Sequence, residues 1–360
     1  MLRIFCLALA ILLSSLLSPS ASLADGWTAC MAQPAPKFFY VADKSRKLLF
    51  QMEEKSGATS VAREFECIHG RVEGDKQKEG DLKTPEGVYF ITRVITQKLD
   101  YMEYGPYAVA LNYPNPADRL RKKTGSGIWL HSKGKKITGI TTRGCLAIDK
   151  GEIMEIAPLL KPGTPVIVAE KVAGAPFYGQ DGKALPTGEQ KTEAVPASPA
   201  LPGGSTEVFG KLTQEGKADS PAASACVHAV DFPIEPTPAF AAVQTADASS
   251  IRDLTKQWIA LRLQKSEELF TLYDSKAWPT SSREKFSQKK ARLLTEFKER
   301  KAFRIEGDLS ILHGPGYWVS CFTESYALKN GGRRSDLRAL YWMKDASGRY
   351  RIIGEARIRK

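Results

Sequence analysis

Residues 131–145 read HSKGKKITGITTRGC, a stretch that supplies an imidazole and, fourteen residues later, a thiol that follows a glycine. A thiol attacks a carbonyl carbon as the thiolate, so an enzyme of this kind needs an imidazole nearby to accept the proton. Gly134 and Gly139 allow the segment between them to fold back, so that the side chains of His131 and Cys145 can meet. The stretch therefore predicts an active site with a cysteine nucleophile, and the residues around it indicate the fold that holds the site.

Two further residues of this stretch fit such a site. The imidazole must be held in one tautomer, and the backbone carbonyl of Ser132 is the candidate acceptor for its second ring nitrogen. Gly144 lets the backbone turn tightly, so that amide N–H groups near Cys145 can face the oxyanion of an intermediate. A buried structural cysteine and a structural histidine are the alternative interpretation of the same pair.

Outward from this stretch, residues 37–170 consist of short apolar runs separated by turn residues. Gly, Pro, Asn and Asp gather at 80–87 and 113–116, where they fix turns. β-branched and aromatic residues predict strands at 38–41, 47–52, 87–91, 108–111, 128–130 and 166–168. We therefore predict a mostly β catalytic domain over residues 37–170.

The rest of the chain divides into a linker and a second domain. Residues 171–248 hold nine of the 21 prolines and are rich in Ala, Gly, Ser and Thr, a composition typical of a flexible linker. From Ser250, which can cap a helix, apolar residues recur at helical spacing, and a second helix and four strand-like runs follow. Helices followed by a strand meander predict an α+β domain over residues 249–360. Its tryptophans either line an apolar cleft or pack in the core.

The N-terminus has the pattern of an export signal. Arg3, an apolar run at 4–13 and small residues at 22–24 predict a signal peptide over residues 1–24. We therefore expect a secreted, periplasmic protein of the cell envelope that meets the membrane only during export. The net charge of +12 then favours an acidic envelope polymer as the partner, and not a nucleic acid.

Cysteine and histidine usage narrows the chemistry. Five cysteines follow the predicted signal peptide, and an odd count in an oxidising compartment leaves one thiol for chemistry. The sequence lacks Cys-x-x-Cys and His-Glu-x-x-His motifs and has four histidines, so we expect no metal site. It also lacks a phosphate-binding Gly-Lys-Ser/Thr loop, and we expect no cofactor.

The stretch at 131–145 and a second motif at 80–89 together resemble the L,D-transpeptidase (YkuD-like) catalytic domains of bacterial peptidoglycan enzymes. In that family a His begins the motif and Ser/Thr-x-Gly-Cys ends it, as His131 and Thr142-Arg143-Gly144-Cys145 do here. Gly80-Asp81-x-Lys83-Thr84-Pro85-x-Gly87-x-Tyr89 is similar to the family's strand-turn signature. The resemblance implies a thioester at Cys145, with His131, Ser132 and Gly144 in the catalytic group.

Within that family, Tyr113-Pro114-Asn115, the run at 125–131 and the C-terminal helices and strands are more similar to the cell-shape-determining L,D-carboxypeptidase branch. Its appended domain resembles the nuclear transport factor 2-like cone, which implies a C-terminal module that binds a second copy or another protein. The resemblance implies peptidoglycan stem peptides as substrate and release of the terminal D-Ala. It also implies that Arg143, Trp129 and His69 contact the substrate.

The sequence leaves the acceptor of the acyl group open. Water resolves the thioester in a carboxypeptidase, whereas the amine of a second stem peptide, or of a protein to be attached, resolves it in a transpeptidase. Family members often carry His before Gly-Cys and Arg soon after it, whereas here Arg143 precedes the pair and Leu146 follows it. A non-catalytic protein that binds the cell wall is the alternative of another class.

Overall fold

The structure is a computed structural model. It describes residues 31–32, 37–55, 58–95, 97–172, 177–178, 238–281, 284–299, 303–327 and 332–359. The predicted signal peptide lies outside the described residues, as do most of the predicted linker and Cys30, Cys226 and His228.

An eight-stranded sheet forms the first half of the described chain, with the strand order β4-β3-β2-β9-β5-β6-β7-β8. Its strands are β2 (Phe38–Asp43), β3 (Leu48–Lys55), β4 (Ala58–Glu66), β5 (Gly87–Val94), β6 (Ala108–Leu111), β7 (Trp129–His131), β8 (Leu146–Ala147) and β9 (Pro165–Ala169). The pairs β2–β9 and β7–β8 are parallel and the other neighbours are antiparallel. All six predicted strands are present, and the prediction of a mostly β domain is confirmed.

The central strands are buried on both faces. β9 has five buried residues in a row, and the first five residues of β5 are buried as well. Burial on both faces removes the alternation of apolar and polar residues, which explains why these strands appear in the sequence as continuous apolar runs. The core beneath them includes Tyr89, Leu130 and Val166, each 0% exposed.

Short helical elements connect the strands, and a side chain caps the start of each α-helix among them. They are α2 (Tyr101–Tyr104), α3 (Pro116–Leu120), α4 (Lys150–Ile156) and the 3-10 turn η1 (Ala157–Leu159). Asp100 caps α2, Asn115 caps α3 and Asp149 caps α4 by accepting backbone N–H groups. The sequence analysis did not predict these helices or β4.

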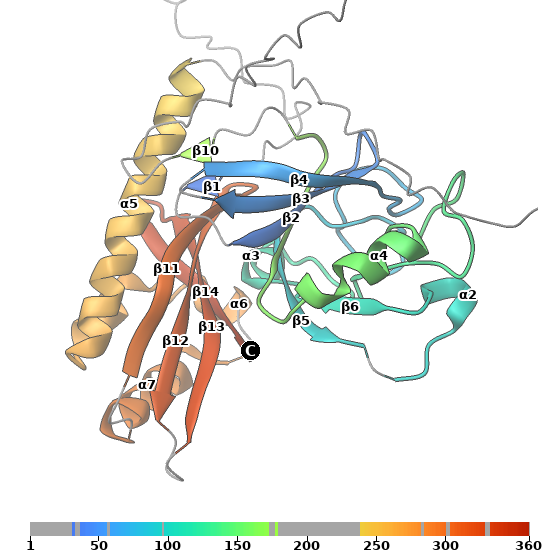
Figure 1. The fold of residues 1–360 in the computed structure, drawn as a ribbon. Coiled ribbons are helices and arrows are strands. Elements are labelled where there is room, and N and C mark those ends of the chain that lie inside the picture. Colours follow the sequence, from blue (N-terminus) through green and yellow to red (C-terminus); the bar gives the residue numbers. More distant parts are fainter. Residues whose placement is uncertain are drawn as a thin grey trace, which may run out of the picture. The chain divides into compact units, whose positions relative to one another are not determined.

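A second, six-stranded sheet carries the C-terminal half, in the order β10-β1-β11-β12-β13-β14. β11 (Phe303–Gly314), β12 (Tyr317–Ala327), β13 (Arg333–Lys344) and β14 (Tyr350–Arg359) form an antiparallel meander, and β1 (Met31–Ala32) and β10 (Phe177–Tyr178) extend it. The helical elements are α5 (Pro238–Leu263), η2 (Glu267–Leu272), α6 (Trp278–Ser281) and α7 (Phe286–Glu299). Figure 1 shows α5 alongside β11 and β12. The predicted mixture of helices and strands is present, and the identity with a nuclear transport factor 2-like cone stays a prediction.

The predicted start of the first C-terminal helix at Ser250 is wrong. α5 begins at Pro238, and Ser250 lies inside it with its hydroxyl donating to the carbonyl of Ala246. The preceding stretch is rich in alanine, a strong helix former, and Ala248 and Ile251 are buried in the core. The described parts of the predicted linker therefore include a strand, β10, and the start of a helix.

The aromatic residues of the C-terminal half pack in its core. Trp258 and Trp342 are 0% exposed and line no open cleft, and Phe322 is 1% exposed. Their polar atoms are bonded inside the protein: the indole N–H of Trp258 donates to the Tyr273 hydroxyl, and that of Trp342 donates to the Ser320 hydroxyl. The core interpretation of these aromatic residues is the correct one.

Both sheets belong to one compact unit of the chain. The hydroxyl of Tyr317 in β12 accepts hydrogen bonds from the Val88 backbone N–H at 2.8 Å and from the Asn115 side-chain amide at 3.1 Å. Tyr317 is 1% exposed, so these bonds are buried. Among the described helices, none is long and apolar enough to cross a membrane.

Candidate active site

Strand pairing brings the predicted imidazole and thiol together. In the parallel pair β7–β8, Leu130 lies opposite Leu146 and His131 lies opposite Ala147. The same register, continued back by one residue, places Cys145 beside Trp129, two residues before His131. Since alternate residues of a strand share a face, the side chains of His131 and Cys145 belong to one face of this pair.

The ring of His131 is held in one orientation. Its Nδ1 lies 2.5 Å from the carbonyl oxygen of Ser132, the acceptor that the sequence predicted. A carbonyl only accepts, so Nδ1 carries the proton and Nε2 keeps the free electron pair. The ring of Tyr104 packs against the imidazole edge to face, with 5.3 Å between centroids. The result is an oriented base whose free nitrogen is Nε2.

Burial keeps this base neutral. His131 is 1% exposed, and loss of solvation lowers its pKa to about 4, an effect that the nearby charge of Lys133 strengthens and the bond to Ser132 opposes. The imidazole is therefore neutral near pH 7 and able to accept a proton.

The thiol of Cys145 is also neutral in the resting protein. Its Sγ lies 3.5 Å from the carbonyl oxygen of Gly127, to which the S–H donates. Burial raises the pKa of the Cys145 thiol, while the backbone N–H of Trp129 and the charges of Lys133 and Arg143 lower it. A neutral thiol beside a neutral imidazole indicates that the proton moves during attack on the substrate.

Glycine is required at position 144. Its φ is 129°, in the region that favours glycine, and a Cβ there would lie 2.7 Å from the backbone oxygen of Lys83. The Thr142 hydroxyl accepts from the Gly144 N–H at 3.0 Å and donates to the Cys145 carbonyl at 2.6 Å. The Gly144 amide is therefore directed at Thr142, and Gly144 has the backbone conformation that the expected tight turn before Cys145 requires.

Thr84 supports this corner, and the sequence analysis did not single it out. Its hydroxyl donates to the Gly144 carbonyl at 3.0 Å and accepts from the Gly70 N–H at 2.8 Å, and its side chain is 0% exposed. Thr84 thereby joins the 80–89 motif to the residue before the nucleophile. The sequence did contain a pointer to this residue, since Thr84 is part of the motif at 80–89 that resembles the family's strand-turn signature.

We expect Thr84→Val to loosen this corner. Valine has the same shape, but it leaves the Gly144 carbonyl and the Gly70 N–H without their partner in a buried place, at a cost of about 2 to 4 kcal/mol in the free energy of unfolding. Urea denaturation measures this loss. The matched control is Thr138→Val at an exposed position, where stability should change by less than about 0.5 kcal/mol. Equal stabilities of the two variants contradict the assignment.

The three residues expected to contact substrate lie in different environments. Arg143 is exposed and Trp129 is partly exposed, with its ring 5.0 Å from that of Tyr104. His69 is 5% exposed, and its ring nitrogens lie 3.1 Å from the carbonyl oxygens of Gly70 and Lys44. The His69 ring is thus bonded inside the protein, so the structure gives it a structural role in place of the predicted substrate contact.

The low pKa of His131 predicts that acid destabilises the fold. Well above pH 6.5 the imidazole is neutral in both states, and between pH 6.5 and about 4 the unfolded state binds most of a proton while the folded state does not. The free energy of unfolding should therefore fall by up to about 3 kcal/mol over this range. Urea denaturation at a series of pH values measures the slope, and His131→Gln should remove this part of it. Identical slopes in the two proteins contradict the prediction.

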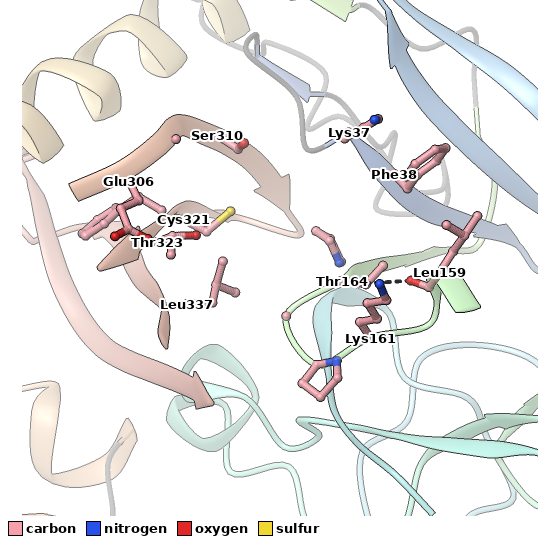
Figure 2. A pocket seen from close by; sticks show the side chains of 15 residues that line it. Lys37, Phe38, Leu159, Lys161, Thr164, Glu306, Ser310, Cys321, Thr323 and Leu337 are labelled. Atoms are coloured by element: carbon pink, nitrogen blue, oxygen red, sulfur yellow. Dashed lines mark hydrogen bonds between the residues drawn. The ribbon is translucent and has the colours of Figure 1, made fainter. Parts of the chain in front are cut away.

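A cavity of about 570 Å³ lies elsewhere. Figure 2 shows Lys37, Phe38 and Lys161 on one side of it and Glu306, Cys321 and Leu337 on the other. Its lining includes neither His131 nor Cys145, so it is separate from the pair described above. Among the described residues, no group of three or more His, Cys, Asp and Glu side chains is arranged to hold a metal ion.

Comparisons with known proteins show what the fold of this chain resembles. Residues 37–168 match the YkuD family model, described as the L,D-transpeptidase catalytic domain. Two solved structures share the fold over nearly the whole chain. Bd1075 of Bdellovibrio bacteriovorus is 17% identical with a TM-score of 0.53, and the alignment covers 92% of this chain and 97% of that one. The helical cell shape determining protein Pgp2 of Campylobacter jejuni is 22% identical with a TM-score of 0.50, over 92% and 93% of the two chains. No curated protein sequence matches significantly.

Proposed function

Because residues 37–168 form an L,D-transpeptidase catalytic domain of the YkuD type, we propose that the protein is a cysteine-dependent peptidoglycan-modifying enzyme. The reaction that it catalyses is that of an L,D-carboxypeptidase, which cleaves the bond between the L-centre of meso-diaminopimelate and the terminal D-Ala of tetrapeptide stems. The observation that carries the proposal is the parallel pairing of β7 and β8, which places Cys145, the residue before β8, on the same face as a neutral, oriented His131.

The reaction has two halves. In the first, Nε2 of His131 accepts the proton of the Cys145 thiol as the sulfur bonds to the carbonyl carbon, and the imidazolium then gives that proton to the departing amine of D-Ala. A thioester at Cys145 remains. In the second half, His131 removes a proton from water, the hydroxide attacks the thioester carbon, and the thiol leaves with the proton. Both halves need an imidazole that is neutral at rest, as the burial of His131 provides.

Two residues beside the nucleophile suit the substrate. The exposed guanidinium of Arg143 can bind carboxylates of the stem peptide by charge-assisted hydrogen bonds. Trp129 is partly exposed next to Cys145 and offers an apolar contact. The proposal includes export to the periplasm by the predicted signal peptide, and a role in cell shape is supported by the fold shared with Pgp2.

Product analysis tests the reaction class. The full chain is incubated with purified disaccharide tetrapeptides, and the products are separated and identified by mass spectrometry. Tripeptides with free D-Ala are the expected result. Cross-linked dimers in their place identify a transpeptidase. Absence of any product, together with retention on isolated cell wall, identifies a binding protein.

A further inference from the structure

The single turn α2 packs closely beside the catalytic histidine. Gly105, which ends α2, lies against Ser132, since a Cβ on this glycine would be 2.0 Å from the Ser132 hydroxyl oxygen. Gly134 lies against the start of α2, where a Cβ would be 2.7 Å from the Tyr101 carbonyl oxygen. The Gly134 N–H also donates to the Met102 carbonyl at 3.3 Å. Residues 132–134 and α2 are therefore in backbone contact at both ends of the turn.

Two side chains of α2 reach the site from this position. Tyr104 packs on the rings of His131 and Trp129, at 5.3 Å and 5.0 Å between centroids. Glu103 forms an ion pair with Lys133, with 2.9 Å between Oε1 and Nζ. The Lys133 side chain is 5% exposed and that of Glu103 is 38% exposed. A buried ammonium group needs an anionic partner, and Glu103 is the carboxylate that supplies it.

We propose that Glu103 and Lys133 are positioning residues: their ion pair, at the turn that packs against His131, balances the charge beside the imidazole and the thiol. The inference deepens the proposed function, because it takes Cys145 as the nucleophile. Neither residue touches the reacting atoms, and both act through His131 and Cys145.

The two charges act in opposite directions on both reacting groups. Lys133 lowers the pKa of the His131 imidazole and of the Cys145 thiol, and Glu103 raises both. Arg143 is the other charged group that acts on the thiol, and it also lowers the pKa. Loss of the Glu103 charge therefore leaves the Lys133 ammonium uncompensated in a place with little solvent, where a charge has a large effect, whereas loss of Lys133 leaves a carboxylate that is 38% exposed.

Alkylation of Cys145 tests this balance without any peptidoglycan substrate. Glu103→Gln keeps a hydrogen-bond partner for Lys133 and removes the negative charge, so more thiolate forms and alkylation near pH 7 should be roughly three- to tenfold faster than in the native chain. Lys133→Met keeps the apolar stem and removes the positive charge, so alkylation should be slower by a similar factor. Mass spectrometry of the peptide that contains Cys145 separates this thiol from the others.

A purely structural role of the ion pair would not make the alkylation rate rise in Glu103→Gln and fall in Lys133→Met. Lys135→Met, at an exposed position of the same loop, is the matched control and should alkylate at the native rate because solvent screens its charge. Lys133→Arg keeps the charge and should also alkylate at close to the native rate. If both substitutions of the pair change the rate in the same direction, or Lys133→Arg is as slow as Lys133→Met, the inference is wrong. The product analysis above is independent of these outcomes, so a failure of the proposed function is recognised separately.

Discussion

Cys145→Ala is expected to abolish the release of D-Ala from tetrapeptide stems, with a rate lower by about 10⁴-fold or more. Alanine removes the sulfur that forms the thioester, and no neighbouring group described at this corner can replace it as a nucleophile. The side chain of Cys145 is partly exposed at a turn, so its truncation leaves no large cavity and the fold should persist. Chromatography of muropeptides before and after incubation measures the release.

Cys321→Ala is the matched control for this experiment. Cys321 is also a cysteine of the described chain, but it is 3% exposed in β12 and lies outside the catalytic half of the chain. Its substitution should leave the rate of D-Ala release within about twofold of the native value, since it does not alter the geometry around His131. Release that persists in the Cys145→Ala protein rejects the proposed mechanism. Cell-wall binding that is unchanged in this variant, with no product from the native chain, supports the binding alternative.

Gly144→Ala is expected to lower the rate of D-Ala release by at least about 100-fold. The new Cβ would lie 2.7 Å from the Lys83 backbone oxygen and the residue has a φ of 129°, so the corner must move. Backbone movement displaces the adjacent Cys145 from the base, and a shift of about 1 Å in a reacting group costs on the order of 100-fold in rate. Steady-state kinetics on tetrapeptide substrate measures the loss.

Gly139→Ala is the control that separates the steric clash of a new Cβ from the strain of a positive φ. Gly139 also has a positive φ, 72°, but a Cβ there meets no atom within 4 Å. This variant should lose about 1 kcal/mol of stability from its backbone conformation and keep most of its activity. Equal activities of the Gly144→Ala and Gly139→Ala proteins show that the contact with Lys83 does not hold the corner.

The strands of the catalytic domain were predictable because they are short, rich in β-branched and aromatic residues, and bounded by Gly and Pro. β4 was missed because its sequence, ATSVAREFE, mixes charged and apolar residues as a half-exposed strand does. The early start of α5 was missed because Ala and Thr are common in linkers, although alanine is also a strong helix former.

The burial of charged residues in the C-terminal half could not be predicted from the sequence either. Arg338, Glu324, Lys289 and Glu355 are spread over β13, β12, α7 and β14, where each is typical of a solvated position. In the structure Arg338 bonds Glu324 through two nitrogens and also contacts Glu355, which Lys289 contacts as well. Their side chains are at most 6% exposed. The sequence of a single strand or helix does not indicate these buried ion pairs, because the partners come from different elements.

The sequence by itself determined the local features of the site. These are the order of His131 and Cys145, the carbonyl that orients the imidazole and the glycine at the corner, and they are fixed by residue type and by neighbours along the chain. Only the tertiary structure decided the protonation of the pair, the role of Thr84 and the burial of Lys133 beside Glu103. These features depend on atoms from segments far apart in the sequence. The burial of a group and the effect of a charge on it are set by the atoms near it in space, whatever their separation along the chain.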